Sequence, residues 1–375
     1  MSEIIYFDNN ATTKPDERVV EAMLPYFYSH YGNEASTMHA FGWAAQSAVE
    51  QARMEVASLI GSEKSEIVFT SGATESINMA LQGIYAAYKS KGNHIITVKT
   101  EHKAVLDTCK FLEANRKASV TYLNVNREGL IDLEELERAI RKETILICVM
   151  AANNETGVIM PYQEIGELAR SRKIIFFTDA TQYAGKMKLY VNEMNADVLC
   201  LSAHKMFGPK GIGALYIRRK NPRVNLIPLI HGGGQENNRR AGTVNVPSIV
   251  GFGKACTIAA SEMWENNAKV SKLRAHFEHQ LLEVDGLRIN GNTKNRLYNT
   301  SNLTFPKVLD IKLLVKKFAF SSGSACTGTD LSHVLQAMQI SNDEIRNSFR
   351  FSFSHHNDLN EVNALLVELM DFLRK

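Results

Sequence analysis

The sequence has no long apolar run, no excess of charge and no internal repeat. Within its 375 residues no apolar segment approaches the ~20 residues that cross a membrane as a helix. The net charge of +3 is nearly balanced and supports neither direct nucleic-acid binding nor a membrane-surface role. The first ten residues, MSEIIYFDNN, contain no basic segment followed by an apolar one, so we expect no signal peptide and a cytoplasmic protein.

Closely paired cysteines are also missing. The five cysteines are scattered without any CxxC pair, so we expect no metal cluster and a reducing compartment. Four of them lie in apolar strand-like or helix-like segments and are expected to pack in the core: Cys109, Cys148, Cys200 and Cys256. Cys326 differs because its surroundings, AFSSGSACTGTDLSH, are small and polar and cannot form a core.

From about residue 65 to 218 the chain alternates short apolar runs with amphipathic ones. Seven runs, rich in Val and Ile, predict buried strands: 66–70, 94–98, 120–124, 145–151, 174–180, 197–203 and 213–219. Three intervening segments predict helices: 73–89, 132–142 and 162–172. This βαβ series indicates an α/β domain with a mainly parallel sheet, in which ligands bind beyond the carboxyl ends of the strands.

After about residue 258 the pattern changes. A long helical run at 260–284 leads into mixed strands and helices, which predicts a smaller α+β domain. We therefore expect a large domain of residues 15–257, and a small domain of residues 1–14 and 258–375 that carries Cys326. The active site is expected where the two domains meet.

Polar residues follow three of the predicted strands. The turn 71–75, SGATE, opens a helix and provides N–H groups and hydroxyls for an anion, although Ser and Thr also cap helices everywhere. Asp179 could be a metal ligand, a helix cap or a partner for a cationic ring nitrogen. Lys205 follows a buried strand, where a charge is disfavoured, although a surface lysine is the commoner case. Together, an anion site, a carboxylate and a lysine are what pyridoxal 5'-phosphate needs, with Lys205 forming the Schiff base.

An ordered set of motifs extends this interpretation over nearly the whole chain. They are YFDNNATTKP, FTSGATES, KTEHKAVLDT, NNETG, DATQ, SAHKMFGPKGIGALYIRRK, HGGG followed by RRAGT, SSGSACT and RFSFS. In order and spacing the sequence resembles the class I cysteine desulfurases of the NifS/IscS type. The resemblance implies the fold of pyridoxal-phosphate-dependent transferases of fold type I.

The resemblance also implies roles for individual residues. Lys205 would bind the cofactor covalently, Asp179 would pair with its ring nitrogen, and His102 would stack on the ring and move protons. Gln182 and Asn154 would contact the phenolic oxygen side of the ring. The phosphate would be held by Ala73, Thr74, Ser202 and His204, and by Thr243 of the neighbouring subunit, which implies a homodimer.

Asn33 and Arg350 would hold the substrate carboxylate, a task that suits an arginine fork. Taken alone, Arg350 fits a surface ion pair and His102 a helix cap. The resemblance implies that Cys326 attacks the sulfur of L-cysteine, which leaves L-alanine and a persulfide on Cys326 for a sulfur-acceptor protein. Small neighbours would let the segment swing.

Three alternatives remain open at this point. An aminotransferase would have no use for a mobile cysteine, and a selenocysteine lyase would favour an RxGxHC-like setting. A non-catalytic scaffold that docks sulfur acceptors would not need both Lys205 and Cys326.

The sequence does not name the acceptor, which could belong to iron–sulfur assembly, tRNA thiolation or DNA phosphorothioation. The stretch after Cys326, GTDLSHVLQAM, has no proline and is about two residues shorter than is usual in the family, which predicts a more ordered loop.

Overall fold

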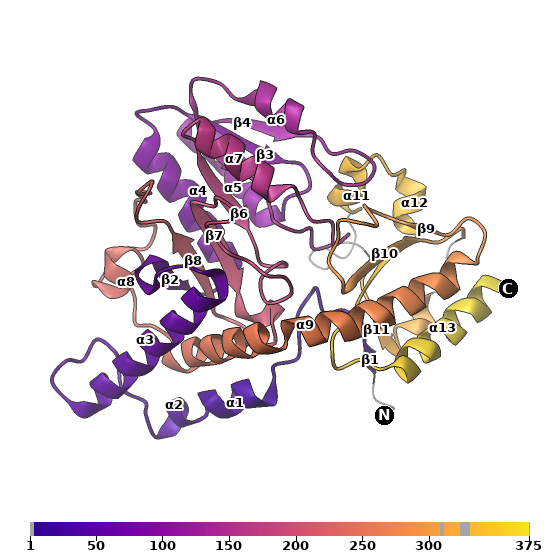
Figure 1. Cartoon of the computed structure of the whole chain (residues 1–375), viewed down its shortest axis with the longest axis horizontal. Coiled ribbons are helices and arrows are strands. Elements are labelled where there is room, and N and C mark those ends of the chain that lie inside the picture. Colours follow the sequence, from indigo (N-terminus) through magenta and orange to yellow (C-terminus); the bar gives the residue numbers. More distant parts are fainter. Residues whose placement is uncertain (1–3, 308–310, 323–330, 375) are drawn as a thin grey trace.

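The structure is a computed structural model that describes residues 4–307, 311–322 and 331–374. Cys326, and with it the expectation of an ordered loop, lies outside these ranges. Figure 1 shows a large sheet domain joined to a smaller body by one long helix, α9 (Val246–Leu282).

A seven-stranded sheet forms the centre of the larger part. Its strand order is β2-β8-β7-β6-β5-β3-β4, and all pairs are parallel except those that β8 makes with β2 and β7. The strands are β2 (Ile67–Thr70), β3 (His94–Val98), β4 (Ser119–Leu123), β5 (Thr144–Cys148), β6 (Ile175–Asp179), β7 (Val198–Ser202) and β8 (Gly213–Ile217). All seven predicted strands are therefore confirmed to within a few residues.

Helices cover both faces of this sheet because its strands are apolar on both sides. On one face, α4 (Ala73–Tyr88) and α5 (Lys103–Arg116) pack against Cys148, Phe177 and Cys200. On the other, α3 (Ala40–Ile60), α7 (Tyr162–Ser171) and α9 pack against the alternating strand residues, such as Phe176 and Leu199. The architecture is the expected α/β fold.

The smaller body is built on an antiparallel sheet of three strands, β9 (Arg288–Ile289), β10 (Thr300–Thr304) and β12 (Ser348–Ser352). It packs against the second half of α9 and against α13 (Leu359–Arg374) through an aromatic core that includes Phe277 and Phe351. The N-terminal strand β1 (Ile5–Tyr6) pairs with β11 (Phe318–Ala319), so the first residues lie with the C-terminal part. The helix α9 runs without a break through residue 257, where we placed the domain boundary.

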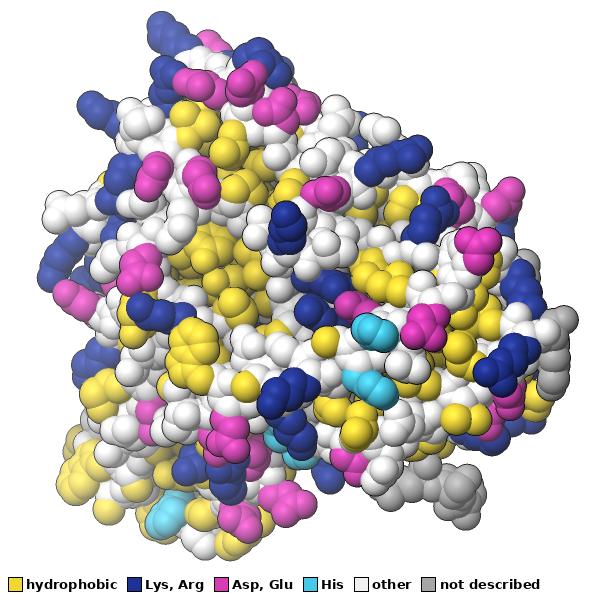
Figure 2. Space-filling model, turned by 45° about the vertical axis from the view of Figure 1, so that its right-hand side comes forward, with side chains coloured by type: hydrophobic (Ala, Val, Ile, Leu, Met, Phe, Trp, Pro, Cys, Tyr) yellow, Lys and Arg dark blue, Asp and Glu magenta, His cyan; other side chains and the backbone are white. Residues whose placement is uncertain are grey.

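The remaining elements are short. They are α1 (Glu17–Met23), α2 (Pro25–Tyr28), η1 (Lys64–Glu66), α6 (Leu133–Ala139), η2 (Ala203–Lys205), α8 (Gln235–Asn238), α10 (Ile311–Leu314), α11 (His333–Ala337) and α12 (Asn342–Arg346). Within the described ranges, no helix is both long and apolar enough to cross a membrane. On the face drawn in Figure 2, acidic and basic side chains are interspersed, as the balanced net charge suggests.

Candidate active site

A cavity of about 640 Å³ opens beyond the carboxyl ends of β2, β6 and β7. The segments that line it come from the N-terminal residues 10–12, the turns after five strands, and two residues of the C-terminal part, His333 and Arg350. Parallel strands bring distant turns to one edge of the sheet, so segments more than 100 residues apart in sequence meet here. This is the region in which the sequence predicts ligand binding.

Lys205 lies in the short helix η2, directly after β7, and it lines the cavity. Nζ donates hydrogen bonds to two backbone carbonyls of the N-terminal segment, Asn10 O and Ala11 O, both at 2.7 Å. The N-terminal segment therefore holds the amine at the wall of the cavity.

Asp179 is the last residue of β6, next to β7, and its side chain is buried. Oδ1 accepts hydrogen bonds from Thr181 N at 2.9 Å and from Cys200 Sγ at 3.3 Å. Burial, and to a smaller extent the nearby Asp179, raise the pKa of Glu101 well above its usual range, which favours the neutral form of Glu101.

His102 is the N-cap of α5, and it also lines the cavity. Its Nδ1 accepts a hydrogen bond from Ala104 N at 3.1 Å, so a neutral ring carries its proton on Nε2. Burial lowers the pKa of His102, which keeps the ring neutral at pH 7. The helix-cap interpretation and the proposed ring contact are therefore compatible for this residue.

The N-terminus of α4 faces the same cavity. Its N-cap, Gly72, has a positive φ of 151° and makes no side-chain cap, so no side chain of its own covers the first N–H groups of the helix. Ser202 and His204 line the cavity nearby. Burial and the charge of Lys205 lower the pKa of His204 to about 4, so this ring acts as a neutral hydrogen-bonding group. The arrangement suits a phosphate-sized anion.

Arg350 lies in β12 with almost no exposed surface and reaches the cavity from the small body. One guanidinium nitrogen donates to Asn154 O at 3.0 Å, and another donates to Asp8 Oδ1 at 2.7 Å. Its Nε is buried and has no hydrogen-bond partner among the described residues. A buried arginine that lines the cavity suits a ligand carboxylate, because its guanidinium group can donate more than one hydrogen bond.

Proteins with this fold have many activities, and comparison with known proteins shows to which family this chain belongs. The sequence profile of the family Aminotransferase class-V matches residues 5–365. A cysteine desulfurase IscS from Anaeromyxobacter sp. (strain Fw109-5) is 48% identical over 379 residues, which covers 99% of this chain and 93% of that protein. The chain belongs to the cysteine desulfurases of the class-V aminotransferase family.

Other cysteine desulfurases agree with this assignment. A human cysteine desulfurase is 45% identical over 376 residues, covering 99% of this chain and 82% of that protein. A solved structure titled "NIFS-LIKE PROTEIN" superposes with a TM-score of 0.92 at 36% identity, over 99% of this chain and 100% of that one. A structure titled "SspA in complex with cysteine" has a TM-score of 0.84 at 39% identity, over 93% and 98% of the two chains.

Most residues that the family resemblance singled out line this one cavity. They are Ala73, Thr74, His102, Asn154, Asp179, Gln182, Ser202, His204, Lys205 and Arg350. Asn33 and Thr243 are exposed and do not line it, and Asn33 Oδ1 accepts a hydrogen bond from Ala35 N at 2.9 Å. Cys326 lies outside the described residues.

The structure adds residues that the sequence reasoning missed. Asn10 supplies the carbonyl that receives both Lys205 Nζ and Gln182 Nε2, and Glu155 accepts a hydrogen bond from Ser332 at 2.5 Å beside the cavity. Both lie inside quoted motifs, YFDNNATTKP and NNETG, but their contacts are with residues far away in sequence. Asn10 makes these contacts with its backbone carbonyl, which every residue has, so the identity of its side chain could not predict them.

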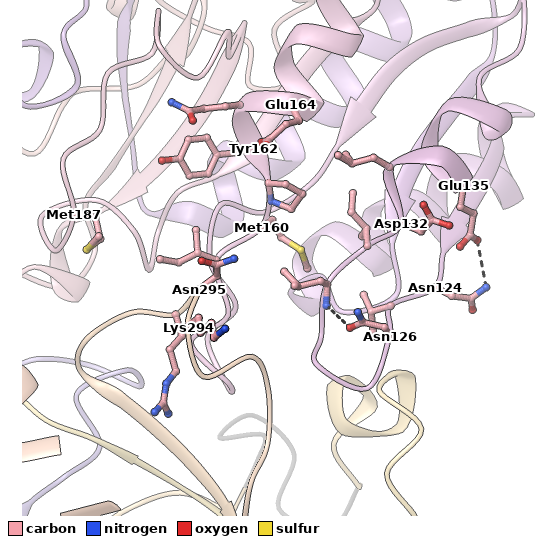
Figure 3. A pocket seen from close by; sticks show the side chains of 18 residues that line it. Asn124, Asn126, Asp132, Glu135, Met160, Tyr162, Glu164, Met187, Lys294 and Asn295 are labelled. Carbon is pink, nitrogen blue, oxygen red and sulfur yellow. Dashed lines mark hydrogen bonds between the residues drawn. The ribbon is translucent and has the colours of Figure 1, made fainter. Parts of the chain in front are cut away.

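A second, larger cavity of about 850 Å³ lies elsewhere, between the loops around 124–135, 159–164 and 294–296 (Figure 3). In Figure 3 its polar side chains, among them Asn124, Tyr162 and Lys294, are spread around the opening. None of the predicted site residues lines it. Size alone therefore does not decide between the two cavities, and the candidate active site is the smaller one, which the predicted residues at the strand ends line.

Proposed function

We propose that this chain uses pyridoxal 5'-phosphate to remove sulfur from L-cysteine, giving L-alanine and a persulfide on Cys326. The observation that carries the proposal is the convergence of Lys205, Asp179 and the N-terminus of α4 on one cavity. An amine, a buried carboxylate and an anion site at neighbouring strand ends match the aldehyde, ring nitrogen and phosphate of this cofactor.

The donor set of the cavity fits the cofactor. Lys205 would bind it covalently, Asp179 would hold a proton on the ring nitrogen, and His102 would cover the ring face. Gln182 and Asn154 would contact the ring oxygen, and the phosphate would be held by Ala73, Thr74, Ser202, His204 and the partner subunit's Thr243. Pyridoxal phosphate supplies the electron sink that weakens the bond between Cβ and sulfur of the amino acid.

The substrate L-cysteine would bind through its carboxylate to Arg350, whose place in the wall of the cavity supports this role. Asn33 would be a further contact of the substrate carboxylate, although it is exposed and does not line the cavity of its own subunit. The neutral His102 would accept and return a proton beside the reacting carbons, because its lowered pKa keeps it basic in form at pH 7. The complex of SspA with cysteine is a neighbour with the same fold and supports the substrate class.

The four cysteines that the structure describes do not suit the role of nucleophile. Cys109, Cys148, Cys200 and Cys256 are buried, and burial raises the pKa of each thiol, to about 12 for Cys109. Such thiols do not form the thiolate that attacks sulfur. In the proposed step the thiolate of Cys326 forms an S–S bond while the substrate's C–S bond breaks. The electron pair stays on the carbon, which is then protonated to give alanine.

A homodimer is part of the proposal. Large apolar side chains that a monomer would leave in water gather on α2, α3 and the segment between them: Phe27, Tyr28, Tyr31, Met38, Phe41 and Trp43. Exposed aromatic clusters of this kind are typical of protein interfaces. An exposed Thr243 would then serve the site of the neighbouring subunit. We propose a cytoplasmic enzyme whose persulfide passes to an acceptor protein of the iron–sulfur, tRNA-thiolation or DNA-phosphorothioation systems.

The experiment that tests this function compares products. Purified protein loaded with pyridoxal phosphate is incubated with L-cysteine and a thiol reductant, and alanine and sulfide are quantified. We expect equal amounts of both from the native enzyme. Production of pyruvate or of a new amino acid from an added keto acid would instead support the aminotransferase alternative. Turnover of selenocysteine alone would support the lyase, and a colourless, inactive protein would support the docking scaffold.

A further inference from the structure

Lys186 is a second buried lysine directly behind the wall that carries Lys205. It follows β6 in the turn that contains Gln182, and only 5% of its surface is exposed. It does not line the cavity. Its Nζ donates hydrogen bonds to Gln182 O at 3.0 Å, to Lys205 O at 3.2 Å and to Gln182 Oε1 at 3.4 Å. The amine thus contacts two residues that do line the cavity.

These contacts fix which way the Gln182 amide points. With Oε1 toward Lys186, Nε2 points toward Asn10 O and donates to it at 2.9 Å. The reversed amide would set two acceptors against each other at Asn10, and it would set two donors against each other at Lys186 when that amine is charged. Lys205 Nζ donates to the same Asn10 carbonyl at 2.7 Å. The NH₂ end of Gln182 and the amine of Lys205 are therefore held side by side at one point of the wall.

Packing alone does not account for an amine in this place. Lys186 forms no ion pair with any described carboxylate, and its acceptors are all uncharged. Burial and the nearby charge of Lys205 lower the pKa of Lys186 to about 7, which shows that the site disfavours its charge. A methionine has nearly the same length and would fill the space without that penalty.

We propose that Lys186 is a positioning residue. It orients the Gln182 amide so that Nε2 can donate to the cofactor, and it anchors the backbone of Lys205, whose amine would bind the cofactor covalently. The inference rests on the proposed cofactor role of this cavity. Gln182 would then donate from Nε2 to the ring oxygen of pyridoxal phosphate. Without Lys186, the amide would be reversed part of the time, with Oε1 facing the ring oxygen in place of Nε2.

The test is the dissociation constant of pyridoxal phosphate, measured by equilibrium dialysis on apo protein. We expect Lys186→Met to raise it about five- to tenfold, the loss of one hydrogen bond of ordinary strength. Lys186→Gln, which keeps an N–H donor one bond shorter, should restore most of the affinity. Lys188→Met is the matched control, because Lys188 is half-exposed just after the same turn, and its contacts are with Glu193 and the Tyr190 ring and not with a residue of the cavity.

A double-mutant cycle separates positioning from general damage. If Lys186 acts through the Gln182 amide, Lys186→Met should have most of its effect in native protein and little in Gln182→Ala protein. Thermal melts of the apo variants verify that each is folded. An unchanged dissociation constant in Lys186→Met, or an equal increase with and without Gln182, overturns the inference. Native protein that binds no pyridoxal phosphate at all would instead refute the proposed function on which it rests.

Discussion

Lys205 is the residue on which the proposed chemistry depends most directly. Its amine is already fixed in the cavity by two carbonyls of the N-terminal segment. We expect Lys205→Ala to lose the covalent attachment of pyridoxal phosphate and at least 10³-fold of the activity, the scale on which a covalent catalytic group contributes. Borohydride reduction followed by peptide mass spectrometry measures the attachment. Cofactor still fixed covalently to the Lys205→Ala variant would show that another lysine does this work.

Cys326 separates the two halves of the reaction. Because we assign it no role in holding the ring, Cys326→Ser should bind pyridoxal phosphate and show a spectral change with L-cysteine like the native protein. It should produce no persulfide, since a hydroxyl is a far weaker nucleophile toward sulfur than a thiolate. Cys109→Ser is the control and should keep activity. Normal sulfide release by Cys326→Ser would remove Cys326 from the mechanism.

The buried amine of Lys186 should also appear in the pH dependence of stability. Burial lowers its pKa from 10.5 in the unfolded chain to about 7, so the unfolded chain binds more protons between these values. The free energy of unfolding therefore rises with pH in this window, by up to about 1.4 kcal/mol per unit, and the penalty is constant below about pH 7. The nearby charge that acts with burial is Lys205, and His204, whose pKa is about 4, stays neutral throughout this window.

Urea unfolding of apo protein at pH 7, 8 and 9 measures this effect. Lys186→Met should be more stable than native protein at pH 7, and the difference should shrink as the pH rises. Lys188→Met should change stability little and equally at each pH, because Lys188 is solvated. If the difference in the free energy of unfolding between Lys186→Met and native protein does not vary with pH, the pKa of Lys186 is not lowered by burial in the folded chain.

At the scale of single residues, the sequence predicted the charged residues at the strand ends but not the residues that hold them in place. Asp179 and Lys205 could be found because charged residues directly after apolar runs are rare. Lys186 donates to the backbone carbonyl of Lys205, and Asn10 accepts from Lys205 Nζ through its own backbone carbonyl. The partners in these contacts are far apart in sequence or joined through the backbone, so only the folded chain shows them.

At the scale of elements, the contact between α3 and α9 joins the sheet domain to the helix that continues into the small body. Gly253 of α9 lies against Ala52 of α3, and an added Cβ would be 2.7 Å from Ala52 Cα and 2.3 Å from Glu55 Oε2. We expect Gly253→Val to lower the free energy of unfolding by about 1–3 kcal/mol through overpacking. Ala260→Val, at an exposed position of α9, should cost much less. Equal urea midpoints for the two variants would contradict this packing.

The apolar runs predicted the strands well because buried strands must be apolar on both faces. They did not predict that β8 runs antiparallel to its neighbours, since direction depends on the connection and not on composition. The long helix begins at Val246, well before the predicted 260–284. Most residues of its first turns are buried, so the sequence shows no amphipathic pattern there by which the helix could be found. The boundary that we expect after residue 257 lies inside this helix.

For the whole molecule, the proposal requires two subunits per complete site. We expect Thr243→Ala to weaken pyridoxal phosphate binding even though Thr243 is exposed on its own subunit. Mixed dimers of Thr243→Ala and Lys205→Ala chains should regain activity, because one of their two sites contains both native residues. The measurement is activity after co-refolding or subunit exchange. A mixture no more active than its two components would place Thr243 outside the neighbouring site.

The central claim is that sulfur leaves L-cysteine and stays on Cys326. The most direct test is one turnover without reductant, followed by alkylation and mass spectrometry of the peptide that contains Cys326. The account predicts one added sulfur atom on Cys326 and one alanine for each sulfur transferred, with none on the four buried cysteines. Alanine formed while Cys326 carries no added sulfur would contradict it.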